Sequence, residues 1–238
     1  MSHAIITSDI SVQIQGKTIL HPTSISIKKG ENVGIIGRNG AGKSTFMKAM
    51  LGLIAHSGGS NLSSKTLSDR VRLASWVPQD RELVWDIKVE TLLQFTIEKV
   101  KETENFIAIK KFIDTKEALS ITGTLKLANA RIKSLSGGEL TSVLIARALV
   151  QQTSIIFLDE PLASLDPIQK RTILEVLQEM SQSGKTIISS LHDIELGKEY
   201  FSKYIAMREG SVICEGTPLQ ILKKKQFDKI FVEKNSVC

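Results

Sequence analysis

The sequence predicts an α/β protein in which most strands of the central sheet run parallel. Three short runs carry this prediction, at residues 33–36, 155–158 and 186–189. They lack the alternation of apolar and polar residues that is typical of a strand with one solvent-exposed face. Short apolar runs of this length suit strands buried on both faces. Helical stretches lie between the runs, and buried strands that alternate with helices form mostly parallel sheets.

Two alternating runs come before these strands. Ile10, Val12 and Ile14 are separated by single polar residues, and their side chains are expected to point the same way. A second alternating run covers residues 19–27 and ends at a turn over residues 28–31. Alternation with a period of two predicts antiparallel strands with one buried face.

The hydrophobic spacing becomes helical between roughly residues 80 and 149. Apolar residues recur there three and four positions apart, which predicts two helical faces. The positions are Val89, Leu92, Leu93, Ile97 and Val100, then Phe106, Ile109 and Ile113. We therefore predict a helical insertion in the α/β core. The spacing of apolar residues over 218–231 predicts a further amphipathic helix, with Leu219, Leu222 and Ile230 on its apolar side.

The composition is that of a soluble globular protein. Of 238 residues, 42% are hydrophobic and 24% charged, which excludes intrinsic disorder. Lys and Arg number 31 against 25 Asp and Glu, and a net charge of +6 permits an anionic partner without requiring one. Two cysteines are too few for a disulfide framework. The N-terminus lacks a signal-peptide pattern and no apolar run reaches membrane-spanning length, so we expect no membrane crossing.

A glycine-rich segment follows the first buried run. Residues 37–44 fit the pattern G-x-x-x-x-G-K-S between a strand and a helix-like run, which is the context of a phosphate-binding loop. Glycines let backbone N–H groups curve around phosphate oxygens, and the helix adds its positive end. Lys43 would bridge the β- and γ-phosphates, and Ser44 would bind Mg²⁺. The candidate nucleotide-binding residues are Gly37, Arg38, Asn39, Gly40, Ala41, Gly42, Lys43, Ser44 and Thr45.

Two carboxylates follow the second buried run. Asp159 and Glu160 come directly after residues 155–158. Ligands bind at the carboxyl ends of strands in open α/β sheets. Beside a phosphate loop, Asp159 is expected to hold Mg²⁺, and Glu160 to act as the general base that polarises an attacking water.

A third motif begins a strongly helical run. Residues 135–139, Leu-Ser-Gly-Gly-Glu, precede a stretch to Val150 in which Leu140, Val143, Leu144 and Ala148 share a face. Small residues at a helix start leave N–H groups free to bind an anion. A second anion site in one chain is explained if it serves a nucleotide held by another copy.

Taken together and in order, these motifs resemble those of an ABC-type ATPase. The matching residues are 37–44 (Walker A), Gln79 (Q-loop), 135–139 (signature), 155–160 (Walker B), 164–166 (D-loop) and His192 (switch histidine). The resemblance implies a RecA-like P-loop NTPase core with an antiparallel β subdomain and an inserted helical subdomain. It divides one domain, 1–238, into a core (1–79 and 150–217), a helical subdomain (80–149) and a helical tail (218–238).

The resemblance also implies a mechanism. ABC-type ATPases work as head-to-tail pairs that hold two ATP molecules, with Mg²⁺, between the Walker motifs of one copy and the signature of the other. The signature residues that would clamp the γ-phosphate of the other copy's ATP are Ser136, Gly137 and Gly138. Gln79 would sense Mg²⁺ and the attacking water, His192 would contact the γ-phosphate, and Asp166 would lie across the interface between copies.

The sequence departs from the family pattern at three places. Ile14 takes the position of the aromatic residue that stacks on adenine in many relatives. Glu139 ends the signature where glutamine is commoner. Thr141 and Ser142 replace a usual polar-basic pair. We expect an active site, with aliphatic packing against the base in place of stacking.

Three functions remain open within this resemblance. The favoured one is the ATPase subunit of an importer, peripheral at the cytoplasmic face of the cell membrane, with separate permease subunits and a substrate-binding protein. Residues 128–131, 191–196 and 216–218 resemble the iron-chelate, haem and cobalamin importer group. The alternatives are an efflux ATPase subunit and a soluble ABC ATPase of the iron–sulfur assembly or translation type. Nucleic acid is not an expected partner, because aromatic residues make up only 5% and the positive charge is dispersed.

Overall fold

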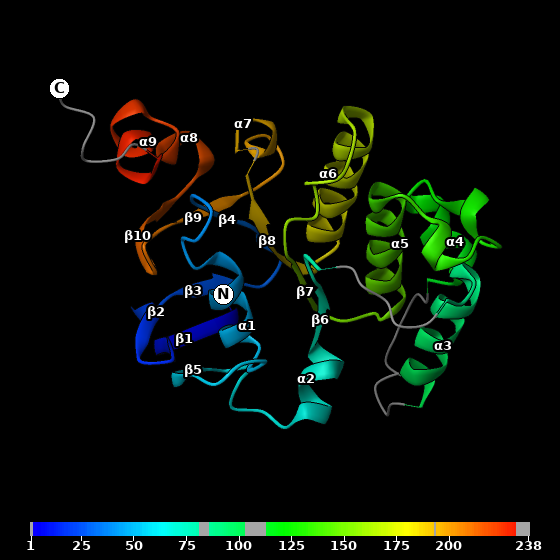
Figure 1. Cartoon of the computed structure of the whole chain (residues 1–238), viewed down its shortest axis with the longest axis horizontal. Helices are drawn as coiled ribbons and strands as arrows, with labels where there is room; N and C mark the ends of the chain where they lie inside the picture. Colours follow the sequence, from blue (N-terminus) through cyan, green and yellow to red (C-terminus); the bar gives the residue numbers. More distant parts are fainter. Residues whose placement is uncertain (1, 81–85, 103–112, 193, 232–238) are drawn as a thin grey trace.

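A six-stranded sheet forms the centre of the computed structural model, which describes residues 2–80, 86–102, 113–192 and 194–231 (Figure 1). Its strand order is β10-β9-β4-β8-β7-β6, and every neighbouring pair is parallel except β9 with β10. This arrangement confirms the predicted mostly parallel sheet. The strands are β4 (Asn32–Ile36), β6 (Ala74–Val77), β7 (Ile155–Leu158), β8 (Thr186–Leu191), β9 (Lys203–Arg208) and β10 (Ser211–Gly216).

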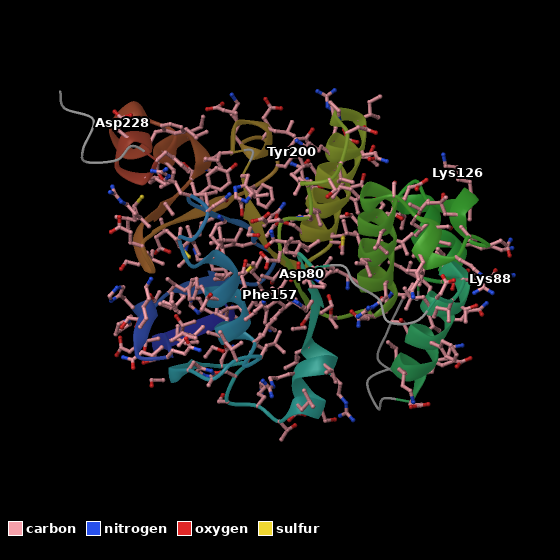
Figure 2. The ribbon with its side chains drawn as sticks, viewed as in Figure 1. Asp80, Lys88, Lys126, Phe157, Tyr200 and Asp228 are labelled. Carbon is pink, nitrogen blue, oxygen red and sulfur yellow. The ribbon has the colours of Figure 1, made fainter. Side chains whose placement is uncertain are left out.

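Successive residues of the central strands face two different hydrophobic cores. In β7, Ile155 and Phe157 pack into one core, whereas Ile156 and Leu158 pack into the other. Figure 2 labels Phe157 in the middle of the molecule. Burial on both faces explains why these strands are short apolar runs without alternation.

A smaller antiparallel sheet covers one face of the central sheet. It contains β1 (His3–Ile14), β2 (Lys17–Thr23), β3 (Ser26–Lys28) and β5 (Ser57–Ser60). Helix α1 (Lys43–Met50) shares a core with both sheets and buries Phe46, Met47, Ala49 and Met50.

The predicted alternating strands differ in two details from the observed ones. The run 19–27 is two strands, because the Ser24 hydroxyl accepts from the Asp9 N–H and donates to the Asp9 carboxylate where backbone pairing would otherwise continue. Ile10 and Val12 are buried as expected, but Ile14 is 52% exposed at the end of β1.

Helices α5 (Gly137–Val150), α6 (Pro167–Gln182) and α7 (Ile194–Gly197) pack on the other face of the central sheet, and α3 (Val89–Lys101) and α4 (Thr115–Ile121) pack against α5. Helix α2 (Leu67–Leu73) precedes β6, and its Leu73 packs against the core that contains α1. Two short helices, η2 (Leu125–Leu127) and η3 (Ile132–Ser134), lie between α4 and α5. Helix α5 stands between α6 and the pair α3 and α4 in Figure 1, which accounts for its burial nearly all round.

The described part of the helical insertion has the predicted buried face. Val89, Leu93 and Ile97 of α3 are buried, with Leu92 packed beside them. The predicted positions Phe106 and Ile109 lie outside the described residues. Lys88 and Lys126, labelled in Figure 2, mark this helical end of the molecule.

The C-terminal tail is two helices, where the sequence predicts one. Helix α8 (Pro218–Ile221) and helix α9 (Lys224–Phe231) lie at the opposite end of the molecule from α3 and α4 (Figure 1). Ile230 is buried and Leu222 packs against the core, but Leu219 is 76% exposed, so its predicted place on the apolar side is wrong. Leu219 lies on the exposed side of α8, whose buried residues are Pro218 and Ile221. None of the described helices is long and apolar enough to cross a membrane.

Candidate ATP-hydrolysing site

Four neighbouring parallel strands bring the predicted catalytic residues to one edge of the central sheet. The phosphate loop follows β4, His192 follows β8, Asp159 follows β7 and Gln79 lies two residues after β6. Because the strands are parallel, these four segments leave the sheet on the same side. Residues that are as far apart as 37 and 192 in the sequence therefore form one site.

The backbone of the phosphate loop requires glycine at Gly37. Its φ is +151°, and a Cβ built there would lie 2.3 Å from the Met207 carbonyl oxygen. Only a residue without a side chain permits this approach. The chain then turns into α1 with Gly42, φ +96°, as the residue before the helix.

Lys43 is held inside the loop. Its side chain is 5% exposed, and its Nζ donates to the carbonyl oxygens of Gly37 (2.9 Å) and Arg38 (3.2 Å). Burial lowers the pKa of Lys43, while Glu160 and Asp159 act in the opposite direction. The amino group is therefore a desolvated cation aimed at the inside of a loop, where an anion such as phosphate would stabilise it.

Asp159 and Ser44 meet directly. The Ser44 hydroxyl donates to Oδ1 of Asp159 at 2.9 Å, and Asp159 is only 2% exposed. Ser190 of β8 also donates to this oxygen, at 2.8 Å, and its hydroxyl accepts from the Glu160 N–H at 2.7 Å. Ser190 thus fixes both carboxylate residues, a role that the sequence motifs do not predict. The available signal was a polar residue at the end of a buried strand.

Glu160 is held through both carboxylate oxygens. Nε2 of Gln79 donates to Oε2 at 3.0 Å, and Nε2 of His192 lies 2.6 Å from Oε1. The residue has φ +50°, a left-handed conformation that is uncommon outside glycine. Strain of this kind is typical of functional sites, where surrounding contacts hold it. Three of the four predicted catalytic side chains, Gln79, Glu160 and His192, therefore form one cluster.

The signature residues lie at the start of α5. Ser136 caps this helix, and Glu139 completes a capping box with it. Gly138 packs so closely against the D-loop segment that a Cβ there would lie 2.8 Å from the Ser164 carbonyl oxygen. Asp166 caps α6 by accepting from the N–H groups of Ile168 and Gln169. The structure thus brings the signature beside the Asp166 segment.

Ile14 lies at the tip of the hairpin formed by β1 and β2, where it pairs with Lys17. The same hairpin borders the phosphate loop, because the Ile19 carbonyl oxygen would lie 3.3 Å from a Cβ at Gly42. An exposed aliphatic side chain on this hairpin suits the base-packing position expected from the sequence.

This site has the features of a P-loop nucleotide hydrolase: a phosphate loop with a buried lysine, a serine bonded to an aspartate, and a glutamate held through both carboxylate oxygens. Residues 20–163 match the model of the family described as ABC transporter. The chain belongs to this family and is one of its ATPases.

Individual relatives agree with this assignment. The chain is 32% identical over 238 residues to the phosphonates import ATP-binding protein PhnC 1 of Nostoc sp., covering 93% of this chain and 90% of that protein. It is 33% identical over 223 residues to the cobalamin import ATP-binding protein BtuD of Halobacterium salinarum, covering 90% of this chain but only 55% of that protein.

A solved structure supports the same fold over nearly the whole chain. The structure of cbiO1 from Clostridium perfringens, part of the ABC transporter complex cbiONQ, has a TM-score of 0.79 and 28% identity. The match covers 96% of this chain and 94% of that chain. It confirms the ABC ATPase fold expected from the sequence.

Proposed function

We propose that this chain is the ATP-hydrolysing subunit of an importer, peripheral at the cytoplasmic face of the membrane, with separate permease subunits and a substrate-binding protein. The observation that carries the proposal is the alignment of about nine-tenths of the chain with import ATP-binding proteins. The divergence of their named substrates, phosphonates and cobalamin, supports substrate recognition by other subunits. Among substrates, we propose cobalamin, haem or an iron–siderophore complex.

The phosphate loop would bind the β- and γ-phosphates through its N–H groups and Lys43. Ser44 and Asp159 would hold Mg²⁺, because their paired oxygen atoms are the hard ligands that this ion prefers. A bound Mg²⁺ would neutralise charge on the phosphates. Gln79 would face the same ion, since its amide lies beside Glu160.

Glu160 would take a proton from the water that attacks the γ-phosphorus, giving ADP and phosphate. A general base must be oriented before it can act, and the contacts of Gln79 and His192 fix both of its oxygens. His192 would also contact the γ-phosphate. Glu160 can turn toward water only if its contact with Gln79 or with His192 is broken. ATP binding would break such a contact by drawing one of these side chains toward the nucleotide.

A second copy would complete the site. Ser136, Gly137 and Gly138 would contact the γ-phosphate of ATP on the other copy, and Asp166 would lie at the interface between copies. The position of these residues at the N-terminal end of α5 supports this role, because the positive end of a helix dipole favours a bound anion. Hydrolysis would then remove the group that joins the two copies.

The permease would dock on a largely apolar hollow between α2, α3 and α5. The hollow has a volume of about 930 Å³, and its wall includes Val71, Leu92, Phe95 and Arg147. Phe95 and Val71 are 57% and 59% exposed and line the same hollow, and contiguous exposed apolar surface of this kind marks interaction sites. Burial lowers the pKa of Arg147, so a carboxylate from the docked segment would compensate its charge.

Purification of the tagged chain from its native membranes in mild detergent tests the proposal. We expect a polytopic membrane protein to co-purify in fixed ratio with the wild type. Phe95→Glu should lose this partner but still bind ATP, because Phe95 lies outside the phosphate site. Leu219→Glu is the matched control, since it adds the same charge at a residue that is 76% exposed on α8. Recovery of a soluble assembly factor or ribosomes without a membrane protein would contradict the importer.

A further inference from the structure

The last residue of the signature makes direct contact with Ser136, near its start. The Ser136 N–H and the Ser136 hydroxyl both donate to Oε2 of Glu139, at 2.9 and 2.8 Å. In return, the Glu139 N–H donates to the Ser136 hydroxyl oxygen at 3.3 Å. Ser136 and Gly137 are exposed, so this contact lies at the surface where the proposed phosphate contact would form.

The contact occupies the group that a phosphate needs. A serine hydroxyl carries one proton, and here that proton is donated to a carboxylate. A phosphate oxygen only accepts hydrogen bonds. It can therefore bind the Ser136 hydroxyl only after the O–H has turned from Glu139 toward the phosphate. Hydrogen bonds to a charged group are stronger than neutral ones, so turning the O–H has a cost.

The charge of Glu139 acts in the same direction. The hydrogen bonds from the Ser136 backbone and side chain lower the pKa of Glu139, so the carboxylate is ionised at neutral pH. A negative charge in hydrogen-bond contact with Ser136 lies within a few ångströms of any phosphate that Ser136 binds. Like charges at that separation repel.

We propose that Glu139 weakens the ATP-driven pairing of two copies by holding the Ser136 proton and by repelling the incoming γ-phosphate. This inference rests on the pairing described under Proposed function. Glu139 is a positioning residue, because it acts through Ser136 and through its charge. Pairing would then need a higher ATP concentration, or a further stabilising partner such as the permease.

Glu139→Gln tests the inference because it changes the charge and little else. The glutamine oxygen can accept from the Ser136 N–H, so the capping box and α5 are retained. The variant is made in a Glu160→Gln chain, which slows hydrolysis, and pairing is followed by light scattering against ATP concentration with Mg²⁺. We expect pairing to tighten about fivefold at each site, hence ~25-fold for a symmetric pair. Glu98→Gln, on the exposed face of α3, is the control for loss of one negative charge.

Two further measurements separate this effect from a structural one. Raising the salt concentration screens exposed charges, so it should strengthen pairing of the parent chain, which keeps Glu139, more than that of the Glu139→Gln variant. In a Ser136→Ala background, Glu139→Gln should tighten pairing by a smaller factor. Only the loss of charge repulsion remains there, because no hydroxyl proton has to be released.

The outcomes are distinct. Equal pairing of the Glu139→Gln and parent chains, at low and high salt, would overturn the inference and leave the pairing itself intact. Weaker pairing of the variant would also overturn it. Absence of pairing in the Glu160→Gln parent at saturating ATP would instead overturn the proposed two-copy site, and the inference with it.

Discussion

Lys43 combines a functional requirement with a cost to folding. Its amino group is enclosed by the loop, bonded to two carbonyl oxygens, and has a pKa lowered by burial. The unfolded chain therefore holds this proton more tightly than the folded chain does. The penalty is present at neutral pH and disappears as the pH rises above the ordinary value of a lysine.

Replacement of Lys43 by methionine should separate these two effects. MgATP hydrolysis should nearly disappear, because the bridge to the β- and γ-phosphates is lost. The nucleotide-free protein should melt at a higher temperature at pH 7, since the lowered pKa means that the buried charge costs folding free energy, and the gain should shrink near pH 10. Calorimetry measures the melting temperature, and phosphate release measures the rate of hydrolysis. Retained turnover in Lys43→Met would contradict the assignment of the phosphate loop.

Individual contacts in the site depend on the fold more than on the sequence motifs. The sequence identifies Lys43, Ser44, Asp159 and Glu160, because each belongs to a motif with a clear chemical logic. It does not identify Ser190, whose contact with Asp159 depends on the neighbouring positions of β7 and β8. Sequence patterns report local geometry, whereas such cross-strand contacts require the tertiary structure.

At the scale of elements, predictability follows the range of the interactions that define each element. The runs 33–36, 155–158 and 186–189 lie in β4, β7 and β8 as expected, since burial on both faces leaves a strong local signal. The split of the run 19–27 depends on Ser24 bonding to Asp9, fifteen residues away. The break between α8 and α9 was also not predicted, because the spacing of Leu222 and Ile230 fits one continuous helix.

Asp166 shows how one residue serves an element and an interface. Its side chain caps α6 with a capping box shared with Gln169. Asp166→Ala should therefore lower stability by about 1 kcal/mol, and Asp166→Asn by much less, because asparagine also caps helices well. Urea unfolding of both variants checks this order. Equal losses would show that the charge, and not the cap, stabilises α6.

At the scale of the whole molecule, the proposed pairing of two copies would explain why one chain carries both a phosphate loop and a signature motif. The loop, the carboxylates and His192 meet at one edge of the central sheet, while the signature packs beside the Asp166 segment at the start of α6. The hollow beside α3 would offer a separate surface for the proposed permease.

Of the two signature glycines, Gly137 is the one that can be altered with less damage to the fold. A Cβ at Gly137 would lie 3.5 Å from its nearest neighbour, which is ordinary contact, whereas one at Gly138 would collide with backbone. Gly137→Asp adds a negative charge where the phosphate of the other copy would bind. Aspartate is also well suited to the first turn of a helix, so α5 should remain folded.

The most direct test of the shared site mixes two inactive chains, Lys43→Ala and Gly137→Asp. Each alone should hydrolyse little ATP, because every pair it forms lacks either the phosphate loop or the signature at both sites. A mixed head-to-tail pair has one intact site, so an equal mixture should recover about a quarter of wild-type activity by random pairing. Activity of the mixture equal to the average of the two separate chains would contradict a site built from two copies.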